Sequence, residues 1–114
     1  GTYLNKIMDY EAAEINAELL PLRQRLIAMR EKYAAAVEMV TSAKNNEYID
    51  FMARRLVEMA GNIIMGHLLL LDTTRNDKFA TSARIYINMG EAEVAKHAAF
   101  IASYSPEQLA DYRR

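Results

Sequence analysis

The sequence contains no cysteine, which excludes disulfides, thiolate metal sites and a cysteine nucleophile. It is also poor in helix breakers, with four glycines and two prolines among 114 residues, and it lacks runs of β-branched residues. Alanine, leucine, methionine, glutamate and arginine, which favour helices, are common. We therefore expect an all-α protein, and the lack of cysteine favours a cytoplasmic location.

Strong net charge is absent as well. Fourteen basic residues against fifteen acidic ones give a net charge of -1. Nucleic-acid binding needs a basic field, so no nucleic-acid partner is expected. The longest apolar run is shorter than the roughly 20 residues that span a bilayer, and no strongly basic amphipathic face is apparent, so no membrane partner is expected either.

The length fits one domain with a single core over residues 1–114. The chain begins with Gly1 rather than methionine, which fits either a trimmed chain or a piece of a longer polypeptide. We found no internal repeat and no low-complexity segment.

The most informative stretch runs from Tyr48 to Asp72 and predicts one long helix. Its first half has an apolar stripe on one face and polar residues on the other. Between Asn62 and Asp72 the only strongly polar side chain is His67, so this half must be covered on every side. The cover could come from other helices of this chain, from a second copy or from another domain. The residues predicted to form such an interface are Ile64, Met65, Leu68 and Leu71.

Three or four other helices are predicted around this one. An apolar stripe predicts a first helix from Tyr3 to Leu19, and a stripe from Leu22 to Val40 follows Pro21, which either kinks one long helix or starts a new one. Another stripe predicts a helix over residues 77–103. Ser105 and Gln108 form a capping-box pattern for a short last helix that ends at residues 113–114. The fold expected is an antiparallel up-and-down bundle of three to four long helices plus a short C-terminal helix.

Two sets of residues are predicted to join the long helices. The central helix and the helix over residues 77–103 are expected to pair across the polar turn at residues 72–77. In that pairing their small residues allow close approach of the two backbones. These are Ala60, Gly61, Gly66 and Gly90. The same pairing brings charged residues together as structural ion pairs, rather than as a ligand site. These are Arg54, Arg55, Glu58, Glu91 and Glu93.

The two histidines are the candidates for a metal or haem site. His67 and His97 both lie on apolar stripes. The antiparallel pairing, however, places His97 beside Met52 of the central helix, and the two histidines roughly 22 Å apart along the bundle. They cannot share a metal, so no metal ligands are assigned, and buried histidines are the simpler interpretation. A free-standing bundle that binds a cofactor or metal through His67 or His97 is the alternative function. A nucleophilic triad, a glycine-rich phosphate loop and a paired acidic site are missing, and no catalytic or cofactor-binding residues are expected.

Four segments of the predicted central and third helices resemble a known family. They are ARRLVEMAG at 53–61, IIMGHLLL at 63–70, ARIYI at 83–87 and EAEV at 91–94. They resemble the C-terminal helical domain of bacterial FAD-dependent acyl-CoA dehydrogenases. The resemblance covers Tyr48 to Tyr104 well and the first helices by pattern.

The resemblance implies a non-catalytic domain of a larger enzyme that oxidises fatty acyl-CoA to enoyl-CoA. In that family the flavin, the acyl-CoA pocket and the glutamate base belong to the upstream core, so FAD is expected in the parent enzyme and none in this chain. The implied partners are that catalytic core and further copies in a homo-oligomer, with a role in subunit assembly.

Overall fold

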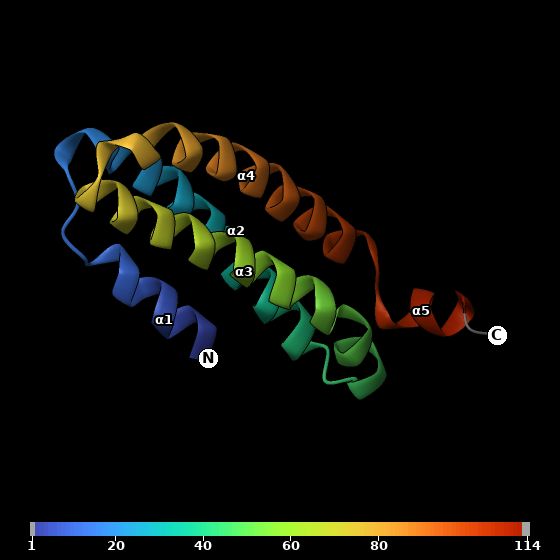
Figure 1. The fold of residues 1–114 in the computed structure, drawn as a ribbon. Coiled ribbons are helices and arrows are strands. Elements are labelled where there is room, and N and C mark those ends of the chain that lie inside the picture. The colour runs from blue at the N-terminus through green and yellow to red at the C-terminus, as the bar shows by residue number, and fades with distance from the viewer. Residues whose placement is uncertain (1, 113–114) are drawn as a thin grey trace.

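The computed structural model describes residues 2–112, and within this range it contains helices and no strand. The long helices are α2 (Leu20–Ser42), α3 (Asn46–Arg75) and α4 (Ala80–Ser103). The short ones are α1 (Thr2–Glu11) and α5 (Pro106–Tyr112), with 3-10 turns η1 (Ala17–Leu19) and η2 (Asp77–Phe79). Figure 1 shows α2, α3 and α4 running in alternating directions, with α1 along the opposite side of α3 from α4. The predicted all-α antiparallel bundle is confirmed.

The beginning of the chain differs from the prediction. The expected helix from Tyr3 to Leu19 ends instead at Glu11, and Pro21 lies in the first turn of α2. Two arginines of α2 fix this early end: Arg23 donates a hydrogen bond to the Ala13 carbonyl, and Arg30 pairs with Glu11 at 3.0 and 3.2 Å. The two-pronged, charge-assisted contact of Arg30 with Glu11 and the bond from Arg23 are specific tertiary interactions, which periodicity along the chain does not reveal.

The core lies where α2, α3 and α4 meet, and the predicted stripes of two helices form much of it. In α2 the buried residues are Leu22, Leu26, Met29, Tyr33, Ala36 and Val40. In α4 they are Ala83, Ile87, Gly90, Val94, His97 and Ile101. Both stripes are confirmed, because a face that repeats every three or four residues can be buried only as a unit.

Side chains cap two of the helices. The Asn45 side chain accepts a hydrogen bond from the Tyr48 amide at 3.0 Å and starts α3, after Lys44 has turned the chain with a positive φ of 52°. At α5, the Ser105 amide donates to Gln108 Oε1 at 2.8 Å and the Gln108 amide donates to Ser105 Oγ at 3.2 Å. The predicted capping box is therefore confirmed. The predicted end of this helix at residues 113–114 lies outside the described residues.

Candidate interaction surface

The candidate functional site is the outer face of α3, which we define by Val57, Gly61, Met65 and Leu68. α3 contacts α2 and α4, with α1 packed beside them, and these contacts bury its other sides. Val57, Met65 and Leu68 are 51%, 43% and 36% exposed, although all three are apolar. Residues three or four apart on a helix share one side, so the four positions form a continuous strip.

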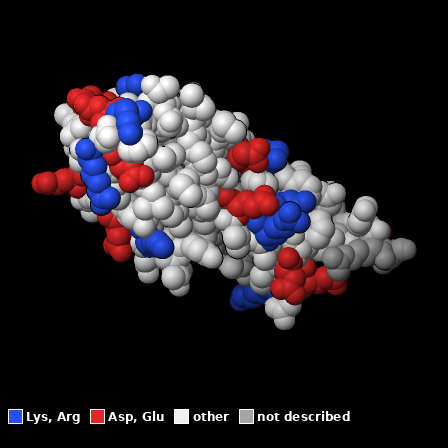
Figure 2. Space-filling view, in the orientation of Figure 1, with Lys and Arg blue, Asp and Glu red and all other residues white. Residues whose placement is uncertain are grey.

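The remaining predicted interface residues lie at the edge of this strip. Ile64 and Leu71 are half-buried, and Ile64 packs against the core. On the neighbouring helix α4, Ile85 and Met89 are exposed apolar residues that the sequence analysis did not single out. Figure 2 shows a broad area without Lys, Arg, Asp or Glu across the middle of this face, between charged groups nearer both ends.

The composition of α3 makes the exposure unusual for a helix at the centre of a bundle. Within the described residues α3 is the one helix long and apolar enough to cross a membrane by length and composition, and 39% of its most apolar 18-residue window is buried here. Central helices of soluble bundles meet the same criterion. In α3, more than half of this apolar window is half-buried or exposed rather than buried.

The glycines predicted to allow close packing fall into two groups. A Cβ added at Gly66 would lie 2.6 Å from Leu26 Cδ2 and 3.4 Å from Ile87 Cγ1, and one at Gly90 would lie 3.5 Å from Asn62 Oδ1. Ala60 is fully buried. The prediction was wrong for Gly61, because a Cβ there would meet nothing within 4 Å. Gly61 faces outward, where glycine costs a helix about 1 kcal/mol relative to alanine.

The charged residues form different pairs from those predicted. Arg54 pairs with Glu58 one turn on, at 3.3 Å, as expected. Glu91, however, pairs with Arg25 of α2 at 3.0 Å, which raises the pKa of that arginine and lowers that of the glutamate through their hydrogen bond. Glu93 pairs with Lys96 at 2.8 Å, and this contact lowers the pKa of Glu93.

Arg55 has an aromatic partner instead of the predicted acidic one. Its guanidinium lies 3.8 Å from the centre of the Phe100 ring and 5.2 Å from that of Phe51. Such stacking holds the cation over the negative face of the ring. The predicted Arg55 pair across α3 and α4 was therefore wrong, because α4 turns Glu91 toward α2 and presents Phe100 to Arg55.

His97 joins α3 and α4 at a different position along α3 from the one predicted. Its Nε2 lies 2.9 Å from Glu58 Oε2 and 3.7 Å from Glu93 Oε2. The prediction that His97 lies beside Met52 was wrong. α3 continues to Arg75 and η2 follows it, so α4 begins later and is shifted along α3 relative to the predicted pairing. A small polar cavity of about 250 Å³ beside this contact is lined by Arg54, Arg55, Glu58 and His97.

His67 lies in a different part of the bundle, beneath α1. It is 2% exposed and its ring stacks on Tyr10, with ring centres 6.0 Å apart. Burial lowers its pKa to about 4, against a smaller upward effect of Glu11, and Arg23 lowers it further. His67 is therefore neutral at neutral pH. Among the described residues no group of three or more His, Asp or Glu side chains could hold a metal.

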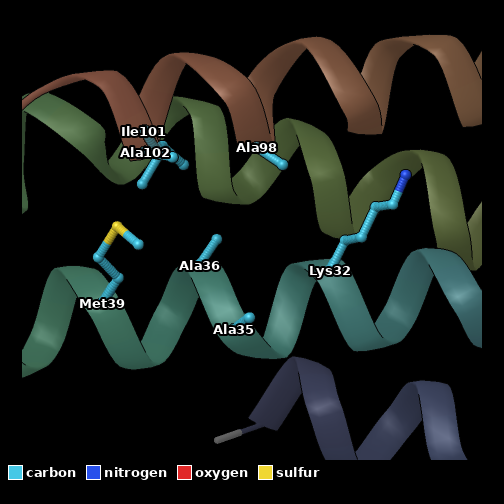
Figure 3. A pocket seen from close by; sticks show the side chains of 7 residues that line it. All are labelled: Lys32, Ala35, Ala36, Met39, Ala98, Ile101 and Ala102. Carbon is cyan, nitrogen blue, oxygen red and sulfur yellow. The ribbon is translucent and has the colours of Figure 1, made fainter.

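A second cavity lies between α2 and α4 and has an apolar lining. Figure 3 shows short alanine side chains of both helices bordering this groove, with Lys32 and Met39 from α2. Its volume is about 210 Å³. Both cavities are below the 300 to 1,000 Å³ typical of sites for drug-sized ligands, so neither suits a molecule as large as FAD.

The fold and its surface define an all-α helical-bundle domain with an exposed apolar strip on α3. Comparison with known proteins gives its family. The family model described as "Acyl-CoA dehydrogenase C terminal" matches residues 1–109. The chain belongs to this family of C-terminal domains, which confirms the resemblance.

A solved structure supports the same conclusion. The chain is similar to an acyl-CoA dehydrogenase family protein from Porphyromonas gingivalis, with 37% sequence identity and a TM-score of 0.88. The similarity covers 93% of this chain and 92% of the other chain. A search of proteins with curated descriptions gave no match.

Proposed function

We propose that this chain is the assembly domain of an acyl-CoA dehydrogenase, and that it acts by burying the outer face of α3 against another protein surface. The observation that carries the proposal is the exposed row of Val57, Met65 and Leu68 on α3, the one described helix that is long and apolar enough to cross a membrane. Exposed apolar residues that form a continuous strip mark interaction sites more often than isolated ones do. Family membership supports the catalytic core of the parent enzyme, or a further copy, as the partner.

The parent enzyme, on this proposal, is a cytoplasmic flavoprotein of fatty acid metabolism that oxidises acyl-CoA to enoyl-CoA. FAD, which supplies the redox chemistry of that reaction, and the catalytic base would both belong to the upstream core. The residues described here do not fit FAD, and the proposed contribution of this domain is to position subunits. The contact of His97 with Glu58 and the Arg55 stack on Phe100 would hold α3 and α4 together behind the interface.

The native polypeptide provides a direct test of the enzyme assignment. We would recover it from its source with an antibody raised against this chain, and record its intact mass, visible spectrum and activity on acyl-CoA. We expect a larger, yellow, flavin-containing dehydrogenase. A colourless polypeptide of 13.0 kDa would contradict the proposal.

Leu68→Glu tests the interface. The substitution places a charge in the middle of the outer face of α3, and burying an unpaired carboxylate costs several kcal/mol. Because Leu68 is already 36% exposed, we expect helix content to persist while association of the native enzyme weakens at least about a hundredfold. Sedimentation velocity would measure it.

Ala99→Glu is the matched control for Leu68→Glu. Ala99 is exposed on α4, away from the buried stripe that faces α3, so the same charge there should leave association unchanged. If Leu68→Glu assembled like the wild type, the outer face of α3 would not be an interface.

A further inference from the structure

The outer face of α3 continues beyond its apolar strip into charged residues at both ends. Asp50 and Arg54 lie before the strip, and Asp72 and Arg75 lie after it. Asp50, Arg54 and Arg75 are exposed, and Asp72 is half-buried. All four follow the spacing of three or four residues that keeps them on the side of Val57, Gly61 and Leu68.

The order of these charges makes the face complementary to itself. At each end an acidic residue comes first and a basic residue follows, so reversing the chain direction exchanges the signs. In an antiparallel pair of α3 helices with a two-fold axis level with residue 63, Arg54 lies beside Asp72 of the second copy. Both are nine residues from that level, about 13 Å along the helix. Asp50 and Arg75 are thirteen and twelve residues away and meet in the same register.

Gly61 fits the same register. It lies two residues before the axis, so it faces Met65 of the second copy, which lies two residues after it. A Cβ on Gly61 would meet nothing within this chain, and Met65 is an exposed, flexible apolar side chain. A methionine of one helix can therefore fill the space that the missing side chain leaves on the other. This gives a reason for a poor helix former in the middle of α3.

We propose that the surface covered by the outer face of α3 is the same face of a second copy, packed antiparallel about a two-fold axis level with residue 63. The inference rests on the proposed function and specifies its partner. A two-fold interface requires one patch that complements itself, which this order of charges provides. A parallel pair is disfavoured because it would place Arg54 beside Arg54 and Asp72 beside Asp72.

Reversing the charge at Arg54 or at Asp72 tests whether these two residues meet in the antiparallel pair. Arg54→Asp places two acidic residues together at each end of the interface, and Asp72→Arg places two basic residues together. We expect each variant of the 114-residue chain to self-associate at least about tenfold more weakly than the wild type at low salt. Sedimentation equilibrium would measure the dissociation constants.

Mixing the two variants gives the sharper result. In a mixed pair, position 54 of the first variant is acidic and meets position 72 of the second variant, which is basic. The unchanged Asp72 of the first variant meets the unchanged Arg54 of the second, so both contacts are restored. An equimolar mixture of Arg54→Asp and Asp72→Arg should therefore associate like the wild type, as should the double variant with itself. Circular dichroism of each chain checks that the fold is retained.

Gly61→Leu tests the packing at the axis without changing charge. Leucine favours the helix and has room in the isolated chain, so helix content should be kept or raised. The leucine side chain at position 61 occupies the space that Met65 of the second copy would fill. Self-association should therefore fall at least about tenfold. Gly61→Ala, which adds one methyl group, is the control and should retain most of the self-association of the wild type.

The outcomes separate this inference from the proposed function. Restoration by mixing supports the antiparallel pair. If the charge variants behave like the wild type while Leu68→Glu still disrupts the native enzyme, the face binds another surface or another register, and this inference alone is overturned. If Leu68→Glu is also without effect in the native enzyme, both are overturned.

Discussion

Gly66→Ala is expected to lower the free energy of unfolding by about 2 kcal/mol, within the range for overpacked cores. The added Cβ would lie 2.6 Å from Leu26 Cδ2, and Leu26 is fully buried. The leucine cannot swing freely away, because it is enclosed by the core that α2, α3 and α4 share. The same added Cβ would also contact Ile87 Cγ1 of α4 at 3.4 Å. Urea denaturation followed by circular dichroism would measure the change.

Two controls identify the cause of this destabilisation. Gly61→Ala makes the same substitution five residues earlier in α3 but in open space, and should raise stability by up to about 1 kcal/mol. Leu26→Ala alone should cost about 3 kcal/mol, and in that background Gly66→Ala should be neutral or stabilising because the clash is gone. Equal effects of alanine at the two glycines would show that the packing described at Gly66 is wrong.

Acidification from pH 7 to pH 5 is expected to destabilise the bundle by about 2 kcal/mol through His67 alone. Burial lowers the pKa of this histidine to about 4 from its ordinary value of 6.5. Between these two values the unfolded chain binds a proton that the folded chain excludes, so stability rises with pH. The contribution is complete above about pH 6.5 and is lost as the pH falls toward 4.

His67→Leu should remove most of this pH dependence. Leucine keeps an apolar side chain beneath Tyr10 and does not titrate, so its free energy of unfolding should change little between pH 7 and pH 5. The measurement is urea denaturation at several pH values in this range, where carboxylates contribute less than the histidine. If wild type and His67→Leu lost stability in parallel, His67 would not be the group responsible.

Much of the fold could be predicted because its evidence is local. The stripes from Leu22 to Val40 and from Ala83 to Ile101 repeat at helical spacing, and burial of such a stripe is the main contribution that makes a helix stable. The capping box at Ser105 uses side chains three residues apart, so its hydrogen bonds can be inferred from spacing. Met65 and Leu68, which are exposed on α3, lie in the segment whose composition is apolar on almost every side.

The partners of individual side chains could not be predicted in the same way. Arg55 has a neighbouring acid in the sequence-based pairing but stacks on Phe100, and Glu91 pairs with Arg25 of a helix that the pairing did not include. These contacts depend on the rotation of α4 and on its shift along α3. A change of a few residues in the turn between them alters every such contact while leaving both apolar stripes intact.

The sequence by itself determined that this chain is a helical bundle whose central helix has a second half that is apolar on almost every side. It did so because helix formation and burial depend on spacing and composition, and its segments also carried the family resemblance. Only the tertiary structure decided which side of that helix is left uncovered. It placed Gly66 against Leu26 and Gly61 in open space, because the direction in which a glycine faces depends on where the neighbouring helices pack.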